Sequence, residues 1–133
     1  MSDTETNLAT ARAYLKALEE ARPRDAAQYF AADVVQIEHP NRLKPKGDRR
    51  SIAAMQADGQ KGLSILRSQT YEIQSAVAGE DRVALEVLWT GVLNVPLGEL
   101  KPGDAMTCFS GIFLDFKDGK ITGQRNFDCF PPF

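Results

Sequence analysis

The stretch EDRVALEVLWTG, residues 80–91, decides the fold class, because its large apolar side chains recur at alternate positions. Successive side chains of a β-strand point to opposite faces of a sheet, so a period of two is typical of a strand with one buried face. The apolar set has odd numbers: Val83, Leu85, Val87 and Trp89. We therefore expect a strand whose odd-numbered face points into the core.

This strand belongs to a run of four extended segments in the second half of the chain, predicted over residues 69–79, 82–95, 104–117 and 120–130. They are separated by GED, by the longer PLGELKPG and by KDG. The dipeptide Asp118–Gly119 is typical of a tight hairpin turn, because both residues tolerate a positive φ angle. The succession predicts an antiparallel sheet.

The first half of the chain is predicted to be mostly helical. Residues 4–21 place apolar side chains at helical spacing and end just before Pro23. A short helix over 26–32, capped by Asp25, and a third over about 49–60, capped by Asp48, are expected further on. Residues 34–40 between them read as a strand that ends at Pro40. Helices followed by antiparallel strands indicate an α+β fold, with the helices covering one face of a curved sheet.

Length and composition make several classes of protein improbable. The 133 residues suit one domain spanning 1–133, and the 16 basic and 18 acidic residues give no basic face for a nucleic acid. The polar start MSDTETN and the lack of an apolar run of about 18 residues predict no secretion signal, no membrane span and a cytoplasmic location. The single histidine predicts no metal site. The two cysteines lack CxxC spacing and are expected to be buried free thiols, with a disulfide or a metal site as the alternatives.

Four segments, in their order and spacing, resemble the NTF2-like superfamily, and in particular its SnoaL-like and ketosteroid-isomerase-like branch. They are ARAYLKALEEARPRDAAQYFAADVVQIEHP (11–40), KGDRRSIAAM (46–55), EDRVALEVLWTG (80–91) and FLDFKDGKITGQRNFDCF (113–130). The resemblance implies a cystatin-like cone, in which three N-terminal helices close over a strongly curved antiparallel sheet. It also implies an apolar pocket between the two layers and, commonly, a homodimer formed across the outer face of the sheet.

The branch includes isomerases, polyketide cyclases, dehydratases, epoxide hydrolases and pocket proteins without a known reaction. The resemblance therefore predicts a cofactor-free isomerase, cyclase or (de)hydratase that acts on a small apolar metabolite by general acid–base chemistry. Two alternatives stay open: a non-catalytic module that binds a small ligand in the same pocket, and a structural dimer whose pocket has no function.

His39 is the first candidate catalytic residue. In ketosteroid isomerase the general base is a carboxylate directly before the proline that ends the first strand, and His39 precedes Pro40 here. Val35, Ile37 and His39 share one strand face, so we expect His39 to point inward with the apolar set and Glu38 to point outward. An imidazole exchanges protons near neutrality, with an ordinary pKa of about 6.5. The alternatives are a structural histidine and a one-residue bulge that reverses the two faces.

Tyr14 is the second candidate, as an oxyanion or hydroxyl donor. Its spacing from Phe30 matches the spacing in the isomerase between the oxyanion-hole tyrosine and a second aromatic residue. A phenol hydroxyl in a dry pocket stabilises a developing oxyanion, whereas the alternative is an aromatic residue with its hydroxyl at the surface. The isomerase's second donor, a protonated aspartate, falls at Gly111, so isomerisation of steroids is not implied.

Asp128 is the third candidate, as a second acid–base group or as the residue that orients His39. It shares its parity on the last strand with Gln124 and Asn126, and the resemblance places this set toward the pocket. The alternative is a structural aspartate near the strand end. The expected pocket wall is mostly apolar with a few polar groups. Its residues are Val83, Leu85, Val87, Trp89, Thr107, Phe109, Phe113, Gln124, Asn126 and Met55.

Two further apolar features point to contacts outside the pocket wall. Leu88 and Val92 make the other face of the 82–95 strand more apolar than a solvated sheet requires, which favours a homodimer through that face. The C-terminal CFPPF is expected to fold Phe130 and Phe133 over the pocket mouth or against a neighbouring copy.

Overall fold

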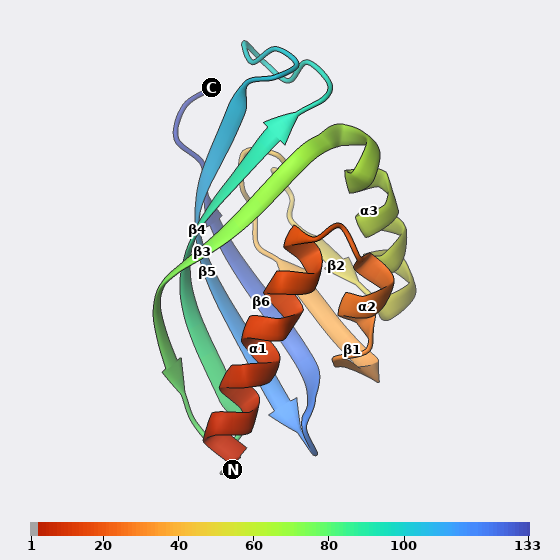
Figure 1. Cartoon of the computed structure of the whole chain (residues 1–133), viewed down its shortest axis with the longest axis vertical. Helices are drawn as coiled ribbons and strands as arrows, with labels where there is room; N and C mark the ends of the chain where they lie inside the picture. Colours follow the sequence, from red (N-terminus) through yellow and green to blue (C-terminus); the bar gives the residue numbers. More distant parts are fainter. Residues whose placement is uncertain (1–2) are drawn as a thin grey trace.

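The computed structural model describes residues 3–133, which form three helices on one side of a six-stranded sheet (Figure 1). In chain order the elements are α1 (Asp3–Glu19), α2 (Pro23–Ala27), β1 (Phe30–Glu38), β2 (Asp48–Arg50), α3 (Ile52–Ile65), β3 (Leu66–Ala78), β4 (Arg82–Leu93), β5 (Ala105–Lys117) and β6 (Lys120–Cys129). The strand order is β2-β1-β6-β5-β4-β3. Only the β1–β6 pair is parallel among the neighbours in this sheet of the described chain. The predicted α+β class of helices over a curved sheet is confirmed, with this parallel pair as the departure from an all-antiparallel sheet.

Helix α1 lies along the inner face of the sheet because one side of it is apolar. Ala11, Tyr14 and Leu15 are buried against the core. Near its start, the Asn7 side chain donates a hydrogen bond of 2.9 Å to the carbonyl oxygen of Glu80, in the turn between β3 and β4. A buried amide with a backbone partner fixes the helix to this end of the sheet.

The other two helices differ in extent from the predictions. Helix α2 begins at Pro23, whose fixed φ angle suits a first helical turn, and β1 already begins at Phe30. Helix α3 is capped by Ser51, whose hydroxyl accepts a hydrogen bond from the peptide nitrogen of Ala54, and not by Asp48. Asp48 instead lies in the short strand β2 and pairs with β1.

The hairpins of the second half agree closely with the sequence pattern. Asp118 and Gly119 have φ angles of 51° and 77°, as a tight turn between β5 and β6 requires. Val83, Leu85 and Val87 are buried, so the predicted inner face of β4 is correct.

The predicted inner face of β5 is wrong. The antiparallel register sets Val87 opposite Ser110 and Leu85 opposite Ile112, and residues opposite one another share a face. The even-numbered residues of β5 therefore point inward with the odd-numbered residues of β4. Phe109 belongs to the outer face and is 59% exposed.

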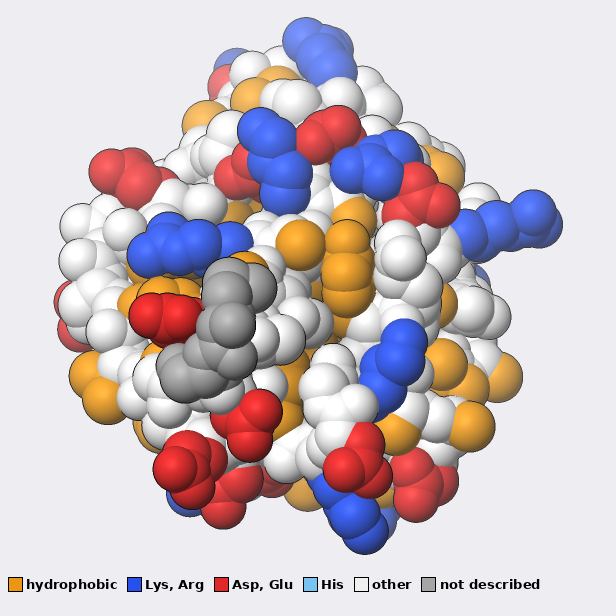
Figure 2. Space-filling model, turned by 60° about the horizontal axis from the view of Figure 1, so that its bottom comes forward, with side chains coloured by type: hydrophobic (Ala, Val, Ile, Leu, Met, Phe, Trp, Pro, Cys, Tyr) orange, Lys and Arg blue, Asp and Glu red, His pale blue; other side chains and the backbone are white. Residues whose placement is uncertain are grey.

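Charged side chains are spread over the surface. Figure 2 shows one face of the molecule on which Lys and Arg side chains alternate with Asp and Glu, with apolar patches between them. No helix in the part of the chain that the structure describes is both long enough and apolar enough to cross a membrane.

Candidate functional site

Two of the cavities in the described structure lie on the inner face of the sheet, and the larger of them extends under the helices. The larger, of about 440 Å³, is bounded by all three helices, β1, β3 and β6. The smaller, of about 180 Å³, lies further along the sheet beside β4, β5 and the C-terminal segment. Four residues line both: Gln69, Tyr71, Ile112 and Asn126. We call this shared wall the boundary between the two cavities.

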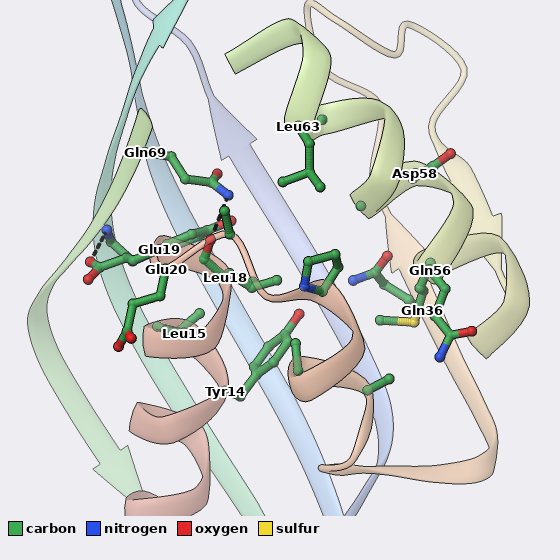
Figure 3. Close-up of a pocket in the computed structure, with 18 of the residues that line it drawn as sticks. Tyr14, Leu15, Leu18, Glu19, Glu20, Gln36, Gln56, Asp58, Leu63 and Gln69 are labelled. Carbon is green, nitrogen blue, oxygen red and sulfur yellow. Dashed lines mark hydrogen bonds between the residues drawn. The ribbon is translucent and has the colours of Figure 1, made fainter. Parts of the chain in front are cut away.

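The helices form the ceiling of the larger cavity, which is mainly apolar but includes Glu19, Gln56 and Asp58, and the sheet forms a floor with polar residues. Its helices contribute Leu15, Leu18, Met55 and Leu63, and Figure 3 shows Tyr14 from α1 and Leu63 from α3 projecting into the same space. An apolar wall with a few polar groups suits a small molecule that is mostly hydrocarbon.

Tyr14 extends from α1 to the floor of the larger cavity, where its hydroxyl meets β6. The hydroxyl donates a hydrogen bond of 2.9 Å to Oε1 of Gln124, and Nε2 of Gln124 donates one of 2.8 Å to Oδ1 of Asn126. The Tyr14 ring meets Phe30 edge to face, with ring centroids 5.0 Å apart. Burial raises the pKa of Tyr14 to about 12, against the opposing effect of the Gln124 bond. Tyr14 is therefore a neutral phenol whose hydroxyl proton is already engaged in the hydrogen bond to Gln124.

Asp128 lines the smaller cavity from β6. Its Oδ1 accepts a hydrogen bond of 2.5 Å from the Ser110 hydroxyl, and its carboxylate has no other hydrogen-bond partner among the described residues. Burial raises the pKa of Asp128, and the bond from Ser110 acts in the opposite direction. A carboxyl group with a raised pKa and one free oxygen in a cavity is suited to proton transfer.

His39 lies outside the lining of both cavities. Its ring stacks on Phe127, with centroids 4.4 Å apart and an interplanar angle of 21°, and Phe127 is 45% exposed. Its peptide nitrogen donates a hydrogen bond to the carbonyl oxygen of Asn126. The prediction that the His39 side chain points into the pocket is therefore wrong.

The two faces of β1 are the reverse of the prediction. The parallel register sets Gln36 beside Gln124 and Glu38 beside Asn126, and the even-numbered residues of β6 face the cavities. Gln36 lines the larger cavity and Glu38 the smaller. Val35 and Ile37 lie on the outer face, next to Arg125 of β6 in the register, so apolarity alone did not identify the inner face of this strand.

Glu38 is held in an ion-pair cluster around Arg50. Arg50 donates hydrogen bonds to Glu38 Oε1 at 2.7 Å and to Asp58 Oδ2 at 2.5 Å. Arg50 also donates to Gln36 Oε1 at 3.1 Å and forms an ion pair of 3.2 Å with Asp48 Oδ2, and Glu38 Oε2 accepts a bond of 2.7 Å from Asn41. Arg50 is only 9% exposed, which requires such partners because burial of an unpaired charge is costly. The cluster connects α3 to β1 and β2, and both carboxylate oxygens of Glu38 accept hydrogen bonds within it.

Tyr71 is one of the cavity residues that the sequence did not reveal. It lines both cavities from β3, and its hydroxyl has no hydrogen-bond partner within residues 3–133. Burial, more than any neighbouring group, raises the pKa of Tyr71 well above its usual range. The apolar alternation of Tyr71 and Ile73 could have indicated an inward face, but a register shift between Ile73 and Ser75 interrupts it.

The remaining predicted wall residues divide into three groups. Met55, Gln124, Asn126 and Trp89 line the cavities, and Trp89 also donates a hydrogen bond of 2.9 Å to Gln69. Buried in the core cluster, outside the lining of either cavity, are Val83, Leu85 and Val87. On the outer face of β5 are Thr107, Phe109 and Phe113. The last two groups are corrections to the predicted wall, and for β5 the reason is the register with β4.

The C-terminal segment closes one side of the smaller cavity. Phe130 lines that cavity together with Leu43, and the Phe133 ring packs edge to face on Phe130 at 6.1 Å. The Arg42 guanidinium lies 4.4 Å from the Phe133 ring centroid and donates a hydrogen bond of 2.5 Å to the Phe133 carbonyl oxygen. Phe130 therefore takes the place expected for it at the pocket.

The two cysteines are free thiols. Cys108 is buried at the smaller cavity, whereas Cys129 is exposed, which corrects the expectation that both are buried. Within residues 3–133, no three His, Cys, Asp or Glu side chains gather in an arrangement that could hold a metal ion.

The comparisons with known proteins come from sequence and from structure. A family model described as a SnoaL-like domain matches residues 11–124. No curated protein sequence matches the chain.

Solved structures with the same fold are numerous. AclR of Streptomyces galilaeus, a candidate hydroxylase, superposes with a TM-score of 0.78 at 21% identity, over 94% of this chain and 79% of that one. IdmH of Streptomyces antibioticus, a candidate polyketide cyclase, superposes with a TM-score of 0.77 at 17% identity, over 92% of this chain and 91% of that one. An LEH-like epoxide hydrolase from M. tuberculosis superposes with a TM-score of 0.73 at 17% identity, over 96% of this chain and 84% of that one. Identities of this size show a shared fold.

Proposed function

Since the chain belongs to the SnoaL-like domain family, we propose that it is a cofactor-free enzyme that uses Asp128 for general acid–base chemistry on a small apolar molecule. The observation that carries the proposal is a single carboxyl group with a raised pKa and a free oxygen, set in a cavity. The reaction class is an isomerisation, a cyclisation, or the addition or removal of water. Proteins of similar fold include a candidate cyclase and an epoxide hydrolase.

The proposed chemical step is removal of a proton next to a carbonyl group. Asp128 accepts the proton on its free oxygen, and the Ser110 hydrogen bond holds the carboxylate in place. A raised pKa makes the carboxylate a stronger base and the carboxylic acid a competent donor for the return of the proton. The apolar wall of the larger cavity would hold the rest of the substrate.

The residues keep some of their expected roles and lose others. Asp128 becomes the main acid–base group, where His39 was expected, because His39 lies on the outer face. Tyr14 acts by positioning, since its proton fixes the Gln124 amide. Glu38 lines the smaller cavity but has both oxygens engaged, so it is not the base in this proposal.

The second candidate function is a binding module that holds a small ligand without turnover. One observation favours it: among the carboxylates that line the smaller cavity, only Asp128 keeps an oxygen without a partner in the described chain. A reaction that needs a separate acid and base would have to use the same group for both steps.

Exchange of 2-tetralone protons for deuterium separates the two functions. This neutral bicyclic ketone has an acidic methylene at C1 and an apolar body, and NMR in D₂O follows the loss of its C1 protons. The enzyme proposal predicts exchange faster than in buffer alone, and a loss of about 100-fold or more in Asp128→Asn, which keeps the Ser110 hydrogen bond. Asp33→Asn, at an exposed position of β1, is the matched control.

Three outcomes would change the conclusion. Binding of 2-tetralone without exchange by the unaltered chain favours the binding module. Exchange that survives Asp128→Asn but disappears in His39→Ala would return the base to His39. Exchange that survives both substitutions would remove Asp128 from the mechanism.

We also propose that two copies pair through the outer face of the sheet. Phe109 and Phe127 are large, exposed and apolar, and Phe113 packs on Phe127 with centroids 5.6 Å apart. Exposed aromatic clusters of this kind are typical of subunit interfaces. Sedimentation of Phe109→Glu should show one chain where the unaltered protein shows two, and an unaltered protein that sediments as a single chain would contradict the proposal.

A further inference from the structure

We propose that Tyr71, and not Tyr14, donates the hydrogen bond that receives the ligand's oxygen atom, at the boundary between the two cavities. The inference rests on the proposed function for the reaction it serves, but the hydrogen bond itself can be tested by binding alone.

Three side-chain donors that line the larger cavity differ in whether another protein group already engages them. The Tyr14 hydroxyl has one proton, which it donates in its hydrogen bond to Gln124. The Gln69 amide donates to the carbonyl oxygen of Leu18 and accepts from Trp89, so both of its ends are engaged. The Tyr71 hydroxyl alone among these three has no partner in the described chain, although it lines both cavities.

A second free donor lies at the same boundary. The Asn126 oxygen accepts from Gln124 Nε2, so the Asn126 amide directs its nitrogen elsewhere, and this nitrogen has no hydrogen-bond partner within residues 3–133. The Tyr14–Gln124–Asn126 series sets this orientation, because a phenol proton fixes which end of the Gln124 amide accepts. Tyr14 is thus a positioning residue for Asn126.

The positions of these groups define how a ligand would lie. Tyr71 and Asn126 stand at the boundary, Asp128 lies beyond it in the smaller cavity, and the mainly apolar ceiling covers the larger cavity. A ligand with its hydrocarbon body in the larger cavity would place an oxygen at the boundary and the adjacent carbon toward Asp128. The ligand class is therefore a neutral, largely apolar molecule with one carbonyl group at its polar end.

The same arrangement accounts for the electrons of the proposed step. The proton leaves carbon for the free oxygen of Asp128, the C–H electron pair forms a C=C bond, and the carbonyl π pair moves onto oxygen. The Tyr71 hydroxyl and the Asn126 amide then donate to that oxyanion, which is stabilised most by donors already in place and shielded from water. Because the raised pKa keeps Tyr71 protonated at neutral pH, the donor is present throughout.

The test compares 2-tetralone with tetralin, the same bicycle without the carbonyl oxygen. Binding of both to the full chain is measured by NMR titration. The inference predicts that the unaltered chain prefers the ketone, and that Tyr71→Phe weakens ketone binding about five- to tenfold while tetralin binding stays the same. Tyr29→Phe, which removes a hydroxyl from a residue outside both cavities, should leave both affinities unchanged.

Several outcomes would overturn the inference. They are equal affinity of the unaltered chain for the two probes, lack of binding of both, equal weakening of both by Tyr71→Phe, and loss of the ketone preference only in Tyr14→Phe. The proposed function fails separately, if Asp128→Asn leaves deuterium exchange intact. A ketone preference that depends on Tyr71 would then persist and identify the donor of a binding site.

Discussion

Removal of one hydroxyl group from Tyr14 should destabilise the protein, whereas the same change at Tyr71 should not. Tyr14→Phe leaves Oε1 of Gln124 without its donor, and Gln124 is only 2% exposed. A buried acceptor without a partner costs about 1–3 kcal/mol. Tyr71→Phe removes a hydroxyl that has no hydrogen-bond partner in the described chain, so the change in unfolding free energy should stay within about 0.5 kcal/mol.

The difference is large enough to measure by thermal unfolding. An unfolding entropy of about 2.1 cal/mol/K per residue gives ~0.28 kcal/mol/K for this chain, so the loss in Tyr14→Phe corresponds to about 4–11 °C in Tm. Urea unfolding followed by the fluorescence of Trp89, the only tryptophan, provides the free energies. Equal destabilisation by the two substitutions would refute the assignment of one hydroxyl to structure and the other to the ligand.

Three further results follow from the titrating groups and the cavity mouth. The pKa of Asp128 is raised in the folded protein, so its negative charge opposes folding at neutral pH. Asp128→Asn should therefore raise Tm at pH 7, and this gain should disappear toward pH 3, where the carboxyl group is protonated. A gain that does not depend on pH would contradict this. The hydrogen bond from Arg125 lowers the pKa of Asp115, so Asp115→Asn should lower Tm at pH 7, and this loss should vanish as the pH falls below that pKa. Phe130→Ala opens the smaller cavity and should speed dissociation of 2-tetralone in NMR exchange measurements, and an unchanged rate would show that the ligand leaves elsewhere.

Much of the fold could be predicted because single strands carry their own signals. The alternation in residues 82–93 identified the inner face of β4, and Asp118–Gly119 identified the last hairpin. Those signals are local: they depend on which side chains of one segment are apolar and on which residues tolerate a positive φ angle.

The site was harder to predict because it depends on pairing between strands. The face of β1 that carries Glu38 follows from the register with β6. The outward face of β1 carries Val35 and Ile37, so it is as apolar as an inward face. The register with β4 likewise decided β5. Nothing in the sequence around Arg50 identifies its partners, and only the tertiary structure shows the carboxylates that pair with it.

A crystal structure of the chain with bound 2-tetralone is the most direct test of how the site works. The carbonyl oxygen should lie at about 3 Å from the Tyr71 hydroxyl and the Asn126 amide nitrogen, with C1 of the ketone facing the free oxygen of Asp128. The bicycle should occupy the larger cavity beneath α3. A ketone bound on the outer face near His39, or one whose oxygen contacts Tyr14 while Asp128 lies beyond reach, would contradict it.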